Sequence, residues 1–346
     1  MTEKLIKDIY NVTKGFSDPI TYTPLDQNNT NLNILCKNGN ANISINIDQE
    51  NRGKYRDLSE NLKVALNKIS GLLSVNIILT SDKIPDQKEI GQNRFKVNAK
   101  NILAIASGKG GVGKSTFAVN FAIALKKIGY KVGILDADVY GPSVPRMMGI
   151  SGKPQVNDNK QLIPLENYGI KCMSIGFLIN VDTPAIWRGP MVMKALEQMF
   201  NGVAWGELDY LIIDLPPGTG DAQLTLAQSS KLSGSIIIST PQDVALIDAR
   251  KGINMFHKVK VPVLGIVENM SFFICSNCKV RHEIFSSGGA KKEAENFNTS
   301  FLGELPIDIN LRINSDNGTP VCISDPDSSI AKTFITIAKI IHSKLN

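Results

Sequence analysis

Largely apolar runs of strand length recur along the chain after residue 100. Five of them show no alternation of polar and apolar positions: residues 102–106, 132–135, 210–213, 235–238 and 263–267. Strands of this kind are covered on both faces, as in a parallel sheet between two layers of helices. Residues 115–128 have the pattern of a helix that stops at Gly129. The chain is therefore predicted to contain an α/β domain with a mostly parallel, doubly wound sheet.

The first hundred residues follow a different pattern. Two segments alternate between apolar and polar side chains, as half-buried strands do: residues 42–47 and 74–79. Residues 58–69 repeat apolar side chains with the period of a helix. We expect a small α+β domain over residues 1–80. Residues 81–100 are polar and without a sustained period, so they are predicted to be a linker to the α/β domain of residues 101–346.

The charge of the chain is spread thinly. Its formal net charge is +6, and the first hundred residues carry 14 basic and 11 acidic side chains. Neither part has the dense basic stripe of a nucleic-acid-binding protein, so a nucleic-acid partner is not expected. No apolar run approaches the roughly 18–20 residues of a membrane span, and residues 1–10 do not resemble a signal peptide. Five cysteines, an odd number, disfavour a disulfide framework, so we expect a cytoplasmic protein without stable membrane association.

A glycine-rich turn follows the first strand of the α/β domain and matches the pattern G-x-x-x-x-G-K-[ST]. Its residues are Gly108, Lys109, Gly110, Gly111, Val112, Gly113, Lys114, Ser115 and Thr116. The pattern is specific here because it lies between a strand and a helix. Glycines let successive backbone N–H groups face phosphate oxygens, and the helix adds the positive end of its dipole. Lys114 is predicted to reach the β- and γ-phosphates, and the Ser115 hydroxyl to ligate Mg²⁺.

Aspartates follow two of the predicted strands. Asp214 comes directly after residues 210–213 and precedes a Pro-Pro-Gly turn, while Asp136 and Asp138 follow residues 132–135. Asp214 resembles a Walker B aspartate that holds Mg²⁺ through water, and Asp138 resembles the switch aspartate that orients the attacking water. Asp136 is an alternative for positioning the metal water. An aspartate at a strand end can also be a helix cap or a turn residue.

Lys109 is a second lysine in the glycine-rich turn, although Lys114 already supplies the charge that a mononucleotide needs. The string around it resembles the deviant Walker A ATPases, the family of MinD, ParA and the nitrogenase iron protein. This resemblance implies that Lys109 crosses a dimer interface to the nucleotide of the partner. It also implies that Asn269 reads the base, which favours ATP because an amide matches the donor and acceptor edge of adenine. The alternative for both residues is an ordinary loop position.

Cys275 and Cys278 form the only closely spaced pair of cysteines. A single C-x-x-C is compatible with redox chemistry, with zinc and with an iron–sulfur cluster. The remaining cysteines are isolated in the sequence: Cys36, Cys172 and Cys322. One chain therefore offers two thiolates, whereas a [4Fe–4S] cluster or a tetrahedral zinc takes four ligands. A symmetric dimer would supply two pairs across its two-fold axis, which is the dimer that Lys109 independently suggests.

Taken together, these motifs resemble the Mrp/NBP35 family of iron–sulfur cluster carrier ATPases. The matching segments are residues 136–143, 187–190, 214–221, 268–278, 281–285, 288–289 and 324–327. The resemblance implies a P-loop ATP hydrolase that forms a homodimer and binds a labile [4Fe–4S] cluster through Cys275 and Cys278. It further implies transfer of the cluster to recipient apo-proteins, with nucleotide binding or hydrolysis required. The first domain resembles the small MIP18-like domain of bacterial members, with residues 47–52 in place of its cysteine-bearing segment.

Two other functions are alternatives to cluster transfer. A spatial-organising ATPase of the MinD or ParA kind would cycle on a membrane or on DNA and would leave Cys275 and Cys278 without a purpose. On a membrane it would use the apolar stripe of residues 330–345, whereas we favour a helix packed on the sheet. A zinc-stapled dimeric ATPase would use the same four thiolates. In the carrier mechanism, we expect the Asp214 turn and the cysteine loop to follow neighbouring strands. The nucleotide state would then alter how the two cysteine pairs approach each other.

Overall fold

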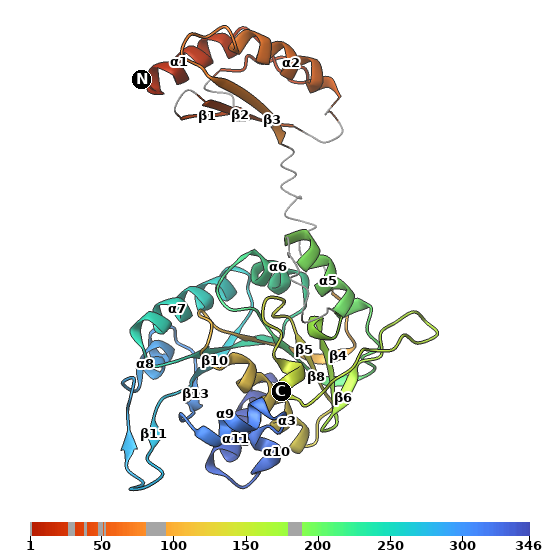
Figure 1. Cartoon of the computed structure of the whole chain (residues 1–346), viewed down its shortest axis with the longest axis vertical. Coiled ribbons are helices and arrows are strands. Elements are labelled where there is room, and N and C mark those ends of the chain that lie inside the picture. The colour runs from red at the N-terminus through yellow and green to blue at the C-terminus, as the bar shows by residue number, and fades with distance from the viewer. Residues whose placement is uncertain are drawn as a thin grey trace. The chain divides into compact units, whose positions relative to one another are not determined.

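The computed structural model describes residues 2–26, 32–37, 40–47, 51, 53–80, 95–178 and 189–346. The chain divides into two compact units, residues 1–90 and 91–346, each with its own apolar core (Figure 1). Residues 81–94 of the predicted linker lie outside the described residues. The rest of that segment belongs to the second unit, because its first strand begins at Ala99 and Phe95 is buried with its ring stacked on Phe200.

The first unit is a three-stranded sheet with two helices. Its elements are α1 (Thr2–Thr13), β1 (Leu32–Lys37), β2 (Asn40–Asn46), α2 (Lys54–Leu66) and β3 (Ser74–Thr80). β1 and β2 pair antiparallel, and β2 and β3 pair parallel. The alternating segments and the expected helix correspond to β2, β3 and α2. The pattern did not predict α1 or β1. β1 was missed because it is a short strand between two clusters of turn-forming residues.

The second unit contains the long central sheet. Among the described residues of this unit, eight strands form the central sheet: β4 (Ala99–Ala106), β5 (Val132–Asp136), β6 (Leu165–Asn167), β7 (Ile170–Ser174), β8 (Leu208–Asp214), β9 (Gly234–Ser239), β10 (Val263–Glu268) and β13 (Phe301–Glu304). The unit also contains a separate two-stranded sheet of β11 (Phe273–Ile274) and β12 (Arg281–His282). Its helices are α3 (Lys114–Lys127), α4 (Val144–Met147), α5 (Gly189–Asn201), α6 (Asp221–Ser229), α7 (Asp243–Lys258), α8 (Gly289–Asn296), α9 (Ile309–Asp316), α10 (Val321–Ser324) and α11 (Ser329–Leu345), with a 3₁₀ turn at Ile175–Phe177.

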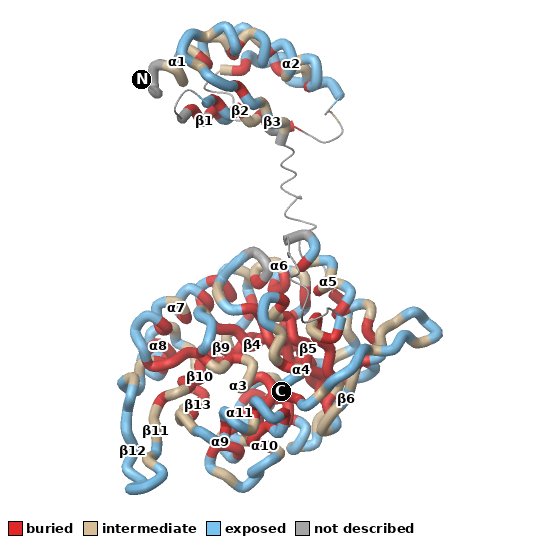
Figure 2. Tube along the Cα trace, in the orientation of Figure 1, coloured by how far each residue is buried: buried red, intermediate tan, exposed pale blue. Residues whose placement is uncertain are grey.

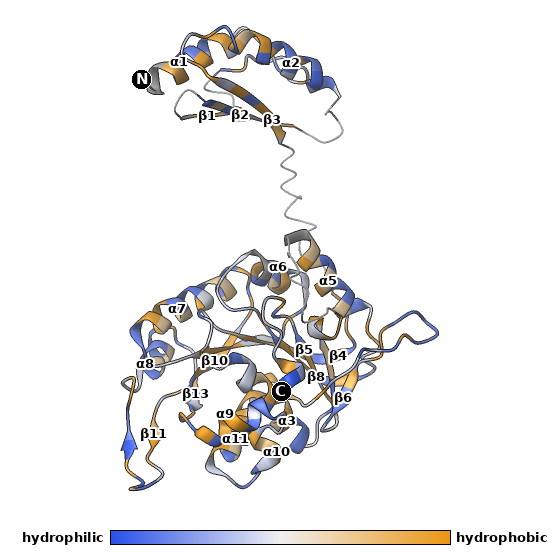
Figure 3. Cartoon of the chain, in the orientation of Figure 1, coloured by the Kyte–Doolittle hydropathy of each residue, from blue (hydrophilic) through white to orange (hydrophobic). Residues whose placement is uncertain are grey.

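The central sheet has the strand order β13-β10-β9-β4-β8-β5-β7-β6. Every neighbouring pair is parallel except β6 and β7 at one edge. Its central strands are hydrophobic and buried (Figures 2 and 3), because helices cover both faces. All five apolar runs lie within these strands, so the predicted α/β fold with a mostly parallel, doubly wound sheet is confirmed.

The helices form a layer on each face of this sheet. α5, α6, α7 and α8 lie on one side, and α3, α9, α10 and α11 lie on the other (Figure 1). The apolar stripe of α11 is buried, with Phe334, Ile337 and Ile341 inaccessible to solvent, and the helix packs against α3. The last helix therefore packs on the body of the unit, as we favoured. Within the described residues, no helix combines the length and the hydropathy required to cross a bilayer.

Candidate functional site

The glycine-rich turn of residues 108–116 connects β4 to α3. Because β4 is central in the sheet, the turn opens at the middle of its carboxyl edge. A side chain at Gly108 would overlap the backbone of Asp248. Gly113 has a φ of +83°, and a side chain there would overlap the amide of Asn269. Only glycine fits these two positions without strain, so the close packing of the turn explains the pattern seen in the sequence.

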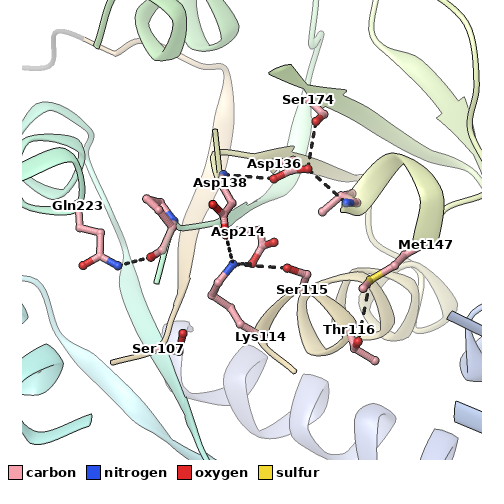
Figure 4. Close-up of polar contacts among 12 residues, drawn as sticks. Ser107, Lys114, Ser115, Thr116, Asp136, Asp138, Met147, Ser174, Asp214 and Gln223 are labelled. Atoms are coloured by element: carbon pink, nitrogen blue, oxygen red, sulfur yellow. Dashed lines mark hydrogen bonds and ion pairs between the residues drawn. The ribbon is translucent and has the colours of Figure 1, made fainter. Parts of the chain in front are cut away.

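Lys114 is the centre of a buried ionic cluster (Figure 4). Its Nζ lies 2.7 Å from Asp214 Oδ1, 3.6 Å from Asp138 Oδ2 and 3.4 Å from Ser115 Oγ. The Lys114 side chain is only 6% exposed, and that of Asp214 is not exposed at all. Charges this deeply buried persist only when an opposite charge lies beside them. The lysine and the two carboxylates therefore hold one another in the protein interior.

The two aspartates that follow β5 have different surroundings. Asp136 is fully buried, and its carboxylate accepts hydrogen bonds from the Asp138 and Val144 N–H groups, both at 3.2 Å, and from Ser174 Oγ at 3.0 Å (Figure 4). Burial and the nearby Asp214 carboxylate raise the pKa of Asp136 to about 8. Asp138 instead lines a cavity of about 630 Å³. Of the two candidates, Asp138 is the one that a water molecule or a phosphate can approach.

Asp214 and Ser115 present oxygen atoms of the kind that Mg²⁺ prefers. Asp214 Oδ2 is buried and has no hydrogen-bond partner among the described residues. A buried carboxylate oxygen without a donor is unusual, and a water molecule on a metal ion would satisfy it. The two side chains both lie against Lys114 Nζ. The residues present therefore fit Mg²⁺ bound as in other P-loop sites.

The cavity of about 630 Å³ lies beside the turn that follows β8. Its lining includes Tyr140, Met193 and Pro217. Gln223 of α6 also lines it, and Gln223 Nε2 donates a hydrogen bond to the Pro216 carbonyl (Figure 4). This contact fixes the Pro-Pro-Gly turn from the helix behind it. Sequence reasoning did not single out Gln223, because a glutamine in a helix has no local signal that separates it from an ordinary surface residue.

The other two predicted nucleotide contacts lie in different settings. Lys109 is exposed and makes no ion pair with another described residue. Asn269 is buried at the end of β10, and its Nδ2 donates to the Val112 carbonyl at 2.8 Å. The structure thus brings Asn269 against the glycine-rich turn. It leaves Lys109 exposed to solvent.

Cys275 and Cys278 lie in the turn of a small hairpin formed by β11 and β12, which projects from the second unit (Figure 1). The Cys275 N–H donates to the Val280 carbonyl at 3.0 Å, and the Lys279 N–H donates to the Cys275 carbonyl at 2.9 Å. Both thiols are free, and Cys278 is exposed. Hydrogen bonds from the backbone of Cys278 and Asn277 lower the pKa of the Cys275 thiol. This favours the thiolate, which is the form that binds metals.

The remaining cysteines, Cys36, Cys172 and Cys322, are buried. Burial raises the pKa of Cys322 to about 12 and also raises that of Cys172. No group of three or more His, Cys, Asp or Glu side chains in the described part of the chain is arranged to hold a metal ion. The hairpin pair therefore stands as two thiols, the incomplete ligand set that the sequence indicated.

The expected proximity of the Asp214 turn and the cysteine loop is wrong. The Asp214 turn follows β8 and the hairpin follows β10, but β4 and β9 lie between these strands. A doubly wound sheet grows outward from its first strand in both directions, so β8 and β9 pair on opposite sides of β4. The Asp214 turn and the hairpin therefore follow strands that lie on opposite sides of β4.

Comparisons with known proteins agree with this geometry. The family model of the ParA class described as NUBPL iron-transfer P-loop NTPase matches residues 98–342. The chain belongs to this NUBPL family. The "Iron-sulfur cluster carrier protein" of Escherichia coli K12 is 48% identical over 293 residues, which cover 84% of this chain and 79% of that protein. The mitochondrial "Iron-sulfur protein required for NADH dehydrogenase" of Arabidopsis thaliana is 56% identical over 241 residues, which cover 69% of this chain and 77% of that protein.

A solved structure from Archaeoglobus fulgidus, a nucleotide-binding protein in complex with ADP, has the fold of this NUBPL-family chain. It is 42% identical with a TM-score of 0.60, and the match covers 68% of this chain and 93% of that one. The resemblance to the Mrp/NBP35 carriers is therefore confirmed, and so is the P-loop NTPase fold. The match to the E. coli protein covers more of the chain than the second unit contains, so it extends into the first unit.

Residues 187 and 188 lie outside the described residues of this NUBPL-family chain, as do residues 48–50 and 52 of the segment that replaces the cysteine-bearing one.

The structure also reveals a polar cluster at the root of the hairpin that sequence reasoning missed. Ser271 Oγ lies 2.6 Å from Glu268 Oε1 and 3.1 Å from Glu304 Oε2. Arg281 of β12 forms two hydrogen bonds to Glu304, at 2.7 and 3.1 Å, and its guanidinium lies 3.9 Å from the centre of the Phe272 ring. Three of these residues come from three different strands and the other two from the segment before β11, so most of their contacts have no signal in a local sequence pattern.

Proposed function

We propose that this protein is an ATP-dependent iron–sulfur cluster carrier. Two copies hold a labile [4Fe–4S] cluster between their hairpins and transfer it to recipient apo-proteins. The observation that carries the proposal is the combination, in one α/β unit, of a complete P-loop with an exposed hairpin that bears only two thiols. Membership of an iron-transfer family supports iron–sulfur cargo over redox chemistry at the same cysteines.

The ligand count favours a homodimer. A [4Fe–4S] cluster takes four thiolates, and the hairpin of one chain presents Cys275 and Cys278 alone. Two hairpins that meet on a two-fold axis complete the set. A cluster held in this way loses half of its ligands when the hairpins separate. The incomplete site in each subunit therefore makes the cluster easy to release.

At the nucleotide end, each residue has a distinct role in this proposal. Lys114 and the N–H groups of the glycine-rich turn hold the phosphates, and Ser115 and Asp214 hold Mg²⁺, which neutralises phosphate charge when bound. Asp138 faces the cavity and orients the attacking water. The exposed Lys109 reaches the nucleotide of the partner subunit across the interface.

The rival functions have less support. A membrane-cycling ATPase would need a free apolar face on α11, and that face is packed in the core. A zinc-stapled dimer uses the same thiols and is separated from the carrier by the metal that the protein binds. A cytoplasmic location remains a prediction.

The test is anaerobic reconstitution with iron and sulfide, followed by metal analysis and measurement of the oligomeric state. We expect about four irons per dimer and a broad visible absorption band. Cys275→Ala is expected to lose both, because it removes one of the two thiols that each hairpin offers. Cys322→Ala is the matched control, since Cys322 is buried away from the hairpin and its loss should leave iron content unchanged.

Stoichiometric zinc in place of iron would overturn the carrier proposal. So would a protein that stays monomeric with and without ATP under these oxygen-free, iron-loaded conditions.

A further inference from the structure

A second cavity, of about 400 Å³, opens beside the P-loop. Two of its lining residues, Gly113 and Thr116, belong to the glycine-rich turn and to α3. The rest of the lining is an apolar surface with a polar rim: Met147, Asn269, Met270, Phe285, Pro306, Ile307, Asp308, Leu311, Arg312, Ser315 and Asp316. The cavity shares no lining residue with the larger one that Asp138 lines.

The position of this cavity identifies its occupant. A nucleotide whose phosphates sit in the glycine-rich turn must extend its sugar and base past Gly113 and Thr116, the residues that open into the cavity. Flat apolar side chains such as Phe285 suit a purine ring, and the Asn269 amide offers both a donor and an acceptor to its edge. The chemistry therefore fits the adenosine moiety of the nucleotide, an assignment that rests on the proposed function.

Both ends of the cysteine hairpin form part of the wall of this cavity. Met270 is the third residue before β11, and Phe285 is the third residue after β12. Another part of the wall is hydrogen-bonded to the hairpin: the Ile307 N–H donates to the Phe272 carbonyl at 2.7 Å. The hairpin that carries the thiols thus begins and ends at the wall of the adenosine cavity.

The root of the hairpin is tied to the central sheet and is not a loose joint. Arg281 pairs with Glu304 of β13 while its guanidinium covers Phe272. Glu268, fully buried at the end of β10, accepts hydrogen bonds from Ser271 Oγ at 2.6 Å and from the Ala290 N–H at 2.7 Å. These contacts make the root a packed unit, so a shift of the cavity wall is passed to the turn that holds the thiols.

We propose that Phe285 is a positioning residue that couples the adenosine of the bound nucleotide to the hairpin. Adenosine packed on Phe285 and Met270 sets the angle at which the hairpin presents Cys275 and Cys278 to the partner subunit. If the bound nucleotide changes the affinity of the two hairpins for the cluster by some factor, thermodynamic linkage requires the reverse effect. The bound cluster must then change the affinity for the nucleotide by the same factor. This route runs through the two ends of the hairpin and replaces the expected route from the Asp214 turn.

The experiment compares the affinity for ADP before and after anaerobic loading of the cluster, by titration calorimetry. In the wild type, loading is expected to change the dissociation constant for ADP by about fivefold or more. In Phe285→Ala the change should fall below about twofold, while the iron content stays at the wild-type level. Phe285→Tyr keeps the ring and should restore the linkage. Ile284→Ala is the matched control, because Ile284 is exposed and does not line the cavity.

The outcomes separate this inference from the proposed function. A wild type that loads iron and binds ADP but shows no linkage overturns the inference alone. Undiminished linkage in Phe285→Ala, or equal loss in Ile284→Ala, does the same because it removes the special role of the ring. A wild type that binds no iron overturns the carrier function and this inference with it.

Discussion

The P-loop and the cysteine hairpin lie in the same α/β unit, but they handle charged groups in opposite ways. Around Lys114, a lysine and two carboxylates form buried ion pairs within one chain. At the hairpin, the thiols are accessible and the ligand set is half of what a cluster needs. The difference fits the two proposed occupants, because a nucleotide needs a preformed site for its phosphates whereas a carrier must also release its cluster.

The ion pairs of the two regions show the same contrast. Lys114 and Asp214 are 6% and 0% exposed, whereas Arg281 and Glu304 are 43% and 37% exposed. Nearly the same distance, 2.7 Å, separates the charged atoms in both pairs. Water screens the second pair and not the first, so equal geometry gives unequal energies.

The largest effect is expected from Lys114→Ala. The substitution removes the charge that we propose holds the phosphates, so nucleotide binding should be lost. It also leaves the Asp138 and Asp214 carboxylates without their cation. Breaking a buried pair costs about 3–5 kcal/mol. Titration calorimetry with ATP and denaturant unfolding measure the two effects separately. Wild-type affinity for ATP would contradict the proposed role of Lys114, and an unchanged free energy of unfolding would contradict the cost of breaking its buried ion pairs.

The next effect is expected from Lys109→Ala. Lys109 is exposed, so the free energy of unfolding and the affinity of the subunit for nucleotide should stay near the wild-type values. A cation supplied to a phosphoryl-transfer site from a partner is worth about 10³-fold or more in turnover, and ATP hydrolysis should fall by this order. A hydrolysis assay at saturating ATP decides the matter. Unchanged turnover would make Lys109 an ordinary loop residue and the nucleotide site complete without a partner.

The sequence predicted the elements and residues on both sides of this contrast. It did not predict the contacts between segments far apart in the chain. The strands around β4 contain continuous apolar runs, and the glycines, Lys114 and the cysteine pair have fixed spacings, so local patterns located them. The order of the strands in the sheet has no local signal, which is why the Asp214 turn and the hairpin were expected to be neighbours. The same holds for Phe285, which lies beside the P-loop only because β10 brings the ends of the hairpin there.

A third prediction concerns pH at the buried end. Burial, with the neighbouring Asp214 carboxylate, raises the pKa of Asp136 to about 8 from 3.8. Between these values the folded protein keeps a proton that the unfolded chain has lost, so this group makes stability fall as pH rises and has no further effect above about pH 8. Asp136→Asn removes the group, and the free energy of unfolding should depend less steeply on pH between 5 and 8.

Denaturant unfolding of the wild type and Asp136→Asn at several pH values in this window measures the difference. Parallel pH profiles for the two proteins would mean that Asp136 is ionised in the folded state.

The smallest effect is expected at the hairpin. Arg281→Met keeps an apolar stem over Phe272 but removes the ion pair with Glu304. Because both partners are more than a third exposed, the pair is screened, and its loss should change the free energy of unfolding by less than about 1 kcal/mol. The difference in unfolding free energy between the wild type and the variant should shrink further in about 1 M salt, where the screening length is only about 3 Å. Urea unfolding at low and high salt measures both quantities, and iron loading should be retained. A loss of several kcal/mol would mean that the hairpin is held as firmly as the P-loop, and release of the cargo would then require more than the separation of two exposed turns.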